Sequence, residues 1–303
     1  MMNNKLPNFL IVGAAKCGTS SLHNYLNQHP EVFMPSYNIE GINVKEPQFF
    51  VKQMVINRIH SGVWDWESYK DLFKQAQNYQ AIGEASVFYL YYFEEAIKNI
   101  KQYLTNEVKI IIILRNPINR AFSAHQHVSR SIKENLSFED AIALEEKRLM
   151  NNETLTPMVM YKDMGLYCAM VNAYLESFNN VHIILYDDFA KNTDNELKKV
   201  FRFLDINENV KVDSRKKHNV GGVRWNNSVV KSILLNNNKL KTIANKYFSK
   251  RIIEKIWDFL SHLFKRKVVK MKTSTKEDLI SFYKKDIIKL SKLINRDLTL
   301  WLR

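Results

Sequence analysis

The residues best suited to chemistry lie in a short loop near the N-terminus. The loop, Gly13 to Leu22 (GAAKCGTSSL), joins an apolar run to a helical pattern. Small residues allow backbone N–H groups to turn toward one point, and a helix N-terminus favours an anion. Lys16 adds a full positive charge. The loop therefore predicts a phosphate-binding cradle, whose candidate residues are Lys16, Cys17, Gly18, Thr19, Ser20 and Ser21.

The predicted cradle differs from the P-loop of nucleoside triphosphatases. Gly13 and Gly18 have the spacing of G-x-x-x-x-G-K-[ST], but Thr19 stands where that pattern requires Lys, which has moved to position 16. The simpler alternative is an ordinary turn between a strand and a helix. We disfavour it because an apolar run, a Lys, a Gly and a series of hydroxyls coincide here.

A second candidate for anion binding follows the apolar run VKIIIIL. The run is followed by Arg115, whose planar guanidinium can donate two parallel hydrogen bonds to a phosphate. Ser123 lies two turns into the next helical pattern. Many P-loop enzymes place a Mg²⁺-binding Asp at such a strand end. The Arg predicts instead that Arg115 and Ser123 bind a second phosphate, and the missing Asp agrees with a reaction in which no metal takes part.

A third candidate lies in the segment Val44 to Phe50 (VKEPQFF). Glu46 has an ammonium beside it in Lys45 and an apolar wall in Phe49 and Phe50, as a general base often does. The alternative is a surface ion pair next to buried aromatic residues.

Short apolar runs and helical patterns alternate along the chain, which predicts an α/β fold with a parallel sheet covered by helices on both faces. Ligands of such sheets bind beyond the carboxyl ends of the strands, where the candidate residues lie. The expected strands are Asn8–Gly13, Gln80–Glu84, Val108–Leu114 and Val181–Tyr186. The expected helices run from Thr19 to Gln28, Pro117 to Ile132, Ser137 to Met150, Gly165 to Phe178, Thr193 to Leu204 and Thr275 to Asn295.

Composition favours one domain over residues 1–303, with a nucleotide-binding α/β core in 1–225 and a basic helical portion in 226–303. Hydrophobic residues make up 46% of the chain, and no apolar run is long enough to cross a bilayer. Two cysteines give no disulfide framework and fit a reducing, cytoplasmic compartment.

The net charge of +14 is concentrated near the C-terminus, where residues 231–303 carry 19 Lys and Arg against 6 Asp and Glu. Such a segment could meet an anionic substrate, a membrane or nucleic acid, or could simply be solvated. An apolar stripe in residues 251–267 could lie on the inner face of a membrane. We favour a helix packed on the domain. No basic surface with interleaved aromatic residues supports nucleic acid as a partner.

Taken together, these segments resemble the sulfotransferases that use 3′-phosphoadenosine 5′-phosphosulfate (PAPS). PNFLIVGAAKCGTSSL is similar to the family's 5′-phosphosulfate loop and ILRNPINRAFSAH to its 3′-phosphate segment. KEPQFF is most similar to the carbohydrate branch, which includes heparan sulfate sulfotransferases and bacterial relatives. GEASVFYL and the C-terminal FYKKDIIKLSKLINRDLTLWL are also typical of the family, so the similarity covers nearly the whole chain.

The resemblance implies a P-loop-like fold and sulfuryl transfer from PAPS to an acceptor hydroxyl, leaving 3′,5′-diphosphoadenosine (PAP). It implies that Lys16 and the rest of the loop bind the 5′-phosphosulfate, that Arg115 and Ser123 bind the 3′-phosphate, and that Glu46 is the base. Further implied contacts are Tyr167 near the adenine, Gly222 and Arg224 in a loop that closes over the nucleotide, and Lys45, Glu84, Ser86 and His127 on the acceptor side.

Two features leave alternatives open. Many carbohydrate sulfotransferases carry a Lys after the Glu of the GE segment, and here Ala85 takes that place. A His is the base in other branches, which makes His125 and His127 rivals of Glu46. The acceptor could be a glycan, a glycolipid or the hydroxyl of a small natural product. A Mg²⁺-dependent phosphotransferase and an inactive membrane-binding protein are the alternatives from other functional classes.

Overall fold

The computed structural model describes residues 5–36, 44–130, 134–151, 155–215, 223–225, 265–267 and 270–303. Its central feature is a five-stranded sheet in the order β2-β3-β1-β4-β5, in which every neighbouring pair is parallel. The strands are β1 (Phe9–Gly13), β2 (Val32–Phe33), β3 (Ala81–Ala85), β4 (Lys109–Leu114) and β5 (Val181–Leu185).

The apolar runs form strands because both faces of this sheet are covered. Every residue of β1 and β3 is buried, as are the last five of β4. A strand buried on both faces needs continuous rather than alternating hydrophobicity. The four predicted strands are confirmed, each end within one residue of its expected position. The short edge strand β2 was not predicted, since two residues leave no periodic pattern.

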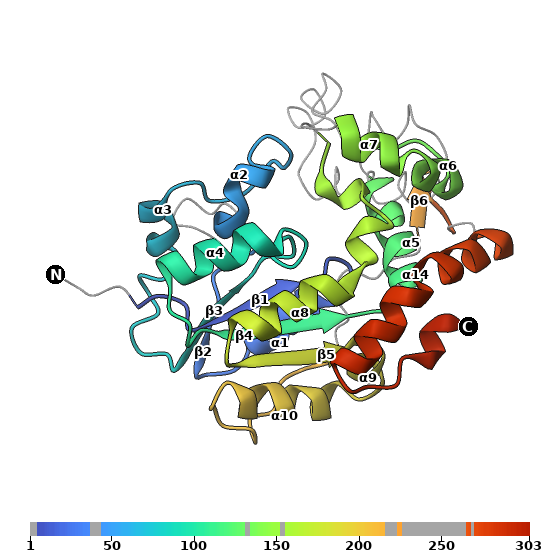
Figure 1. Cartoon of the computed structure of the whole chain (residues 1–303). Coiled ribbons are helices and arrows are strands. Elements are labelled where there is room, and N and C mark those ends of the chain that lie inside the picture. The colour runs from blue at the N-terminus through green and yellow to red at the C-terminus, as the bar shows by residue number, and fades with distance from the viewer. Residues whose placement is uncertain are drawn as a thin grey trace, which may run out of the picture.

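Helices cover both faces of the sheet, which confirms the predicted three-layer α/β fold. Figure 1 shows α4 and α8 on one side of the sheet and α10 on the other. The helices are α1 (Thr19–Leu26), α2 (Lys52–Val55), α3 (Trp66–Asp71), α4 (Phe93–Tyr103), α5 (Pro117–Val128), α6 (Phe138–Ala143), α7 (Glu145–Asn151), α8 (Tyr167–Ser177), α9 (Tyr186–Lys191), α10 (Thr193–Phe203) and α14 (Thr273–Leu293). Short 3₁₀ turns cover Phe49–Val51, Pro157–Val159, Asp163–Gly165 and Thr299–Leu302.

The prediction of one helix from Ser137 to Met150 was wrong. Two helices occupy this stretch, α6 and α7, with Leu144 between them. The Ser137 hydroxyl accepts from the Asp140 N–H at 3.1 Å, so the predicted N-cap is present. The carboxylate of Glu145 accepts from the backbone of Lys162 and Asp163, which fixes the start of α7 on another segment.

The C-terminal helix α14 packs on the α/β core. Tyr283 is fully buried, and its hydroxyl donates to the Lys162 carbonyl at 2.8 Å. The apolar stripe of residues 251–267 lies outside the described residues except for 265–267. Those three form strand β7 (Lys265–Lys267), antiparallel to β6 (Val223–Trp225), where a helix was expected. Within the described part of the chain, no helix is long and apolar enough to cross a membrane.

The topology places the predicted site at the carboxyl edge of the sheet. β1 lies between β3 and β4, so the chain leaves β1 where the strand order reverses, and ligands of open α/β sheets bind there. Gly13 ends β1 with φ +150°, and a Cβ on it would lie 2.7 Å from the Leu90 Cβ. The loop can therefore leave the strand beside the chain that follows β3 only because residue 13 has no side chain.

Candidate active site

A cavity of about 920 Å³ opens beyond the carboxyl ends of β1, β3 and β4. It gathers most of the residues that the sequence analysis singled out, although they come from three separate parts of the chain. The predicted residues that line it are Lys16, Gly18, Thr19, Ser20, Ser21, Lys45, Glu46, Arg115, Ser123 and His127. The candidates for binding two anions and for general-base catalysis therefore share one space.

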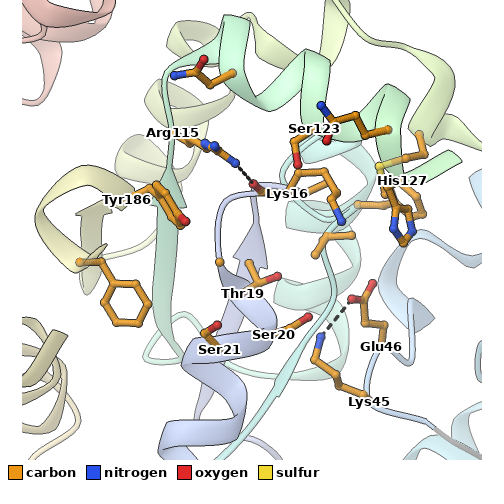
Figure 2. Close-up of a pocket in the computed structure, with 18 of the residues that line it drawn as sticks. Lys16, Thr19, Ser20, Ser21, Lys45, Glu46, Arg115, Ser123, His127 and Tyr186 are labelled. Atoms are coloured by element: carbon orange, nitrogen blue, oxygen red, sulfur yellow. Dashed lines mark hydrogen bonds and ion pairs between the residues drawn. The ribbon is translucent and has the colours of Figure 1, made fainter. Parts of the chain in front are cut away.

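The loop after β1 forms the floor of the cavity. Gly18 is the N-cap residue of α1 at φ +102°, and no side chain caps this end of the helix. A Cβ at Gly18 would lie 3.2 Å from the Tyr186 ring, so glycine satisfies both the backbone angle and the space. Figure 2 shows Thr19, Ser20 and Ser21 side by side at this helix start. Their hydroxyls and the free N–H groups of the first turn suit an anion.

Arg115 lies at one end of the cavity and is held from two directions. Its Nη1 donates to the Lys16 carbonyl at 3.4 Å, and its Cζ lies 4.7 Å from the centroid of the Tyr186 ring. Neither partner is an acid, so the charge of the guanidinium stays available for an anion. The sequence analysis missed Tyr186. It follows β5 directly, so the rule about strand ends could have found it.

Lys16 reaches across the cavity toward α5. Its side chain runs from the loop toward Ser123 and His127 (Figure 2). Burial and the nearby Arg130 guanidinium together lower the pKa of Lys16 to about 8, while the charge of Glu46 opposes both effects. Burial and the charges of Lys16 and Arg130 likewise hold the pKa of His127 near 4. His127 is therefore neutral at physiological pH.

Glu46 faces the cavity from the opposite wall (Figure 2). Lys45 Nζ lies 3.1 Å from Glu46 Oε1, and Gln48 Nε2 donates to Glu46 Oε2 at 3.1 Å. About a third of the Glu46 side chain remains exposed. The predicted pairing with Lys45 is present, and each carboxylate oxygen keeps a lone pair for a further hydrogen bond. Of the two rival histidines, only His127 lines the cavity. The His125 ring is buried, with Nε2 3.0 Å from the Leu136 carbonyl.

Four candidate side chains lie outside the cavity. Cys17 and Tyr167 are fully buried, 3.7 Å apart from Sγ to the hydroxyl oxygen, so Tyr167 does not face an adenine site and Cys17 can serve an anion only through its backbone. Glu84 and Ser86 are fully buried too and hydrogen-bond to each other, which corrects the expectation that they contact an acceptor. Gly222 lies outside the described residues. Arg224 lies in β6, where its backbone is paired with that of Arg266.

The remaining wall of the cavity carries apolar and uncharged polar groups. Thr156 and Met158 face the cavity from the segment before α8. Arg58 holds the start of that segment, because its Nε donates to the Leu155 carbonyl at 2.7 Å and its Nη1 to the Tyr92 hydroxyl at 2.6 Å. Further lining residues on this side are Ile59, Ser61, Val87 and Phe88. This wall has room for a ligand beside the anion-binding groups.

Known proteins with similar sequences are sulfotransferases. Mouse carbohydrate sulfotransferase 15 is 27% identical over 253 residues, which are 66% of this chain and 44% of that protein. Human bifunctional heparan sulfate N-deacetylase/N-sulfotransferase 3 is 31% identical over 202 residues, 63% of this chain and 21% of that protein. The chain thus spans less than half the length of these relatives.

A solved structure and a domain profile agree with these relatives. A sulfotransferase from Alicyclobacillus acidocaldarius superposes with a TM-score of 0.73 at 29% identity, over 99% of this chain and all of the other. The sulfotransferase domain profile matches residues 6–279, which include every described residue that lines the cavity. The resemblance noted in the sequence motifs is confirmed, and the chain belongs to the sulfotransferase family.

Proposed function

We propose that this protein transfers a sulfuryl group from PAPS to a hydroxyl of a carbohydrate. The observation that carries the proposal is that Lys16, Arg115 and Glu46 line one cavity. Lys16 and Arg115 are separated by 99 residues in the sequence. Family membership implies PAPS as donor and PAP as product. The names of the relatives support a carbohydrate acceptor.

The residues present fit a nucleotide that carries anionic groups at two positions. The loop of Lys16 to Ser21 offers an ammonium, three hydroxyls and free backbone N–H groups to the 5′-phosphosulfate. Arg115, stacked on Tyr186, and Ser123 offer a guanidinium and a hydroxyl to the 3′-phosphate. Arginine recognises phosphate through two parallel N–H donors, so Arg115 fixes orientation as well as charge.

Glu46 is proposed as the general base. When bound, PAPS supplies the sulfuryl group, whose bond to the bridging phosphate oxygen breaks as the acceptor oxygen attacks sulfur. Glu46 takes the proton of the acceptor hydroxyl, and Lys45 and Gln48 hold its carboxylate in place for this transfer. Lys16 places positive charge at the end of the cavity where the departing phosphate oxygen gains negative charge.

His127 is the rival base on the other wall. Its pKa near 4 makes the neutral imidazole available as a proton acceptor, but also makes it a weak one. We propose that His127 contacts the acceptor hydroxyl or a sulfuryl oxygen as a hydrogen-bond donor. A Glu46→Gln variant that kept its turnover would transfer the role of base to His127.

The acceptor is proposed to bind between Glu46 and the wall that carries Thr156 and Met158. This wall mixes apolar surface with hydroxyls, which suits a sugar ring with C–H faces and polar edges. Gly222 and Arg224 are proposed to close over the nucleotide, as the family resemblance implies. Contact between the basic C-terminal portion and a membrane is a further proposal, which binding to anionic lipid vesicles would test.

The experiment that tests this function has two stages. First, calorimetry measures PAP binding to the full chain in the absence of Mg²⁺. Then PAPS is supplied with a panel of neutral and acidic polysaccharides, and sulfated products are identified by mass spectrometry. We expect PAP binding and a mass increase of one sulfuryl group on one class of glycan. Absence of PAP binding, or phosphoryl transfer from ATP that requires Mg²⁺, would overturn the proposal.

A further inference from the structure

Glu84 is a buried carboxylate close to the active site without access to it. It is the second-last residue of strand β3, none of its surface is exposed, and it does not line the cavity. Its Oε2 accepts from the Ser86 hydroxyl at 2.8 Å, and its Oε1 accepts from the Tyr69 hydroxyl at 3.4 Å. The hydroxyl of Tyr89 adds a further hydrogen bond. A carboxylate is rarely buried without a reason, because its desolvation is costly.

Two hydroxyls bound to Glu84 hold the backbone of the segment that carries Glu46. The Gln48 N–H donates to the Ser86 Oγ at 2.9 Å, and the Phe50 N–H donates to the Tyr89 hydroxyl at 3.4 Å. A hydroxyl has one proton and two lone pairs. Since Glu84 takes the proton of Ser86, the lone pairs of Ser86 are directed toward Gln48.

The Gln48 backbone needs such support. Its φ of 55° and ψ of 19° lie in the left-handed region, which a non-glycine residue adopts only when its surroundings hold it there. In this conformation the Gln48 side chain returns to Glu46 and donates to Oε2 at 3.1 Å. An unbroken series of hydrogen bonds therefore leads from Glu84 through Ser86 and Gln48 to the proposed base.

We propose that Glu84 is a positioning residue, which fixes the carboxylate of Glu46 toward the acceptor by acting through Ser86 and Gln48. The inference rests on the proposed function, because it requires Glu46 to be the base. It also gives the Glu of the GEASVFYL segment a role other than the acceptor contact expected from sequence.

The charge of Glu84 gives this role a pH dependence. Burial, helped by the charge of Glu46, raises the pKa of Glu84 to about 7, against the hydrogen bonds of Tyr89, Ser86 and Tyr69, which lower it. Tyr174, buried on α8, also senses the Glu84 charge. The ionised carboxylate accepts the hydrogen bond of the Ser86 hydroxyl and so fixes the direction of its proton. A protonated Glu84 no longer holds this proton in place. The plot of kcat against pH should therefore show a step, with kcat decreasing as the pH falls through about 7.

The test compares Glu84→Gln with Ser86→Ala and with the matched control Glu145→Gln. Glu145 is also a buried carboxylate that holds backbone N–H groups, those of Lys162 and Asp163. In Glu84→Gln we expect kcat to fall by about 10-fold, the scale of one hydrogen bond to a charged group, with PAP affinity changed less than about 2-fold. The step near pH 7 should disappear in this variant and persist in Glu145→Gln.

Two further measurements separate positioning from plain structural support. The double variant Glu84→Gln/Ser86→Ala should lose no more kcat than the worse single variant, because both changes break one series. Hydrogen exchange of the Gln48 and Phe50 amides should accelerate in both single variants and stay as in wild type in Glu145→Gln. Additive losses, or unchanged exchange of these amides, would overturn the inference even if Glu84→Gln folded poorly.

The proposed function and this inference can fail separately. If Glu46→Gln retains turnover, the assignment of the base is wrong, whatever Glu84→Gln does. If Glu46→Gln is inactive while Glu84→Gln keeps wild-type kcat and the wild-type pH profile, only the role of Glu84 is overturned.

Discussion

The two ends of the cavity are built in different ways. At the donor end, Arg115 directly follows β4, Lys16 lies in the loop after β1, and the hydroxyls of Thr19 to Ser21 lie in the first turn of α1. At the acceptor end, Glu46 and Thr156 lie on irregular segments, each followed by a short 3₁₀ turn. The sheet therefore fixes the donor groups through the backbone, whereas the acceptor groups depend on side-chain hydrogen bonds such as those of Gln48 and Arg58.

This difference suggests how one fold can serve several acceptors. The donor end needs a sheet edge and a helix start, which any member with the same strand order has. The acceptor end can change through its loops while the sheet stays intact. Substitutions at the donor end should accordingly lower nucleotide affinity, whereas substitutions at the acceptor end should lower turnover.

The largest separation is expected from Glu46→Gln. The amide is close in size to the carboxylate but does not accept the acceptor's proton. We expect kcat to fall by about 10²–10⁴-fold, the range for loss of a general base, with PAP affinity unchanged. Turnover with PAPS and calorimetry with PAP measure the two effects, and Lys45→Gln is the control that removes the neighbouring charge while leaving the carboxylate. Equal loss of PAP affinity would contradict the division into two ends.

Arg115→Ala should give the opposite pattern. Removing a guanidinium that binds a phosphate leaves that phosphate without its strongest donor, and PAP affinity should fall by about 10–100-fold. At saturating PAPS, kcat should change far less. Tyr186→Leu is a useful companion, since it removes only the ring under the guanidinium and should cost less affinity. A kcat loss in Arg115→Ala as large as that of Glu46→Gln would show that the two ends are not separable.

The sequence was most informative where the backbone determines the site. The runs NFLIVG and VKIIIIL form strands within one residue of expectation because short continuous runs of β-branched and apolar residues are typical of strands buried on both faces. Once these strands are parallel neighbours, the loops that follow them must meet. Lys16 and Arg115 were therefore within reach of sequence reasoning, although 99 residues separate them.

Side-chain direction was not within reach. Cys17 and Tyr167 stand in segments typical of the family, yet both point into the core. Nothing in the spacing shows that Tyr186 lies under Arg115, because the contact depends on how β4 and β5 end side by side. The hydrogen bond that the Gln48 N–H donates to the Ser86 hydroxyl likewise depends on the left-handed backbone of Gln48, which a single sequence does not reveal.

The pH dependence of nucleotide binding sharpens the description of the donor end. With the pKa of Lys16 lowered to about 8 in the free protein, the ammonium is present below that pH and lost above it. Binding an anion favours the charged form, so PAP affinity should be constant at lower pH and fall as the pH rises through about 8, by at most about 10-fold per pH unit. Calorimetry between pH 6.5 and about 9.5 would show this decline. Lys16→Arg is the control, because arginine keeps its charge over that range.

The smallest expected effect concerns Arg130, which joins the two ends electrostatically. Its guanidinium lowers the pKa of both Lys16 and His127, and its Nε is buried without a hydrogen-bond partner in the described part of the structure. Arg130→Gln should raise the pKa of Lys16, which moves the decline of PAP affinity to higher pH. Arg130→Lys keeps the charge and should leave the decline in place. Because Arg130→Gln also removes a positive charge near the bound anion, the PAP affinity of this variant below pH 7 should drop slightly, by about 2–5-fold. A decline at the same pH in both variants would mean that burial alone sets the pKa of Lys16, and that the two ends of the cavity titrate independently.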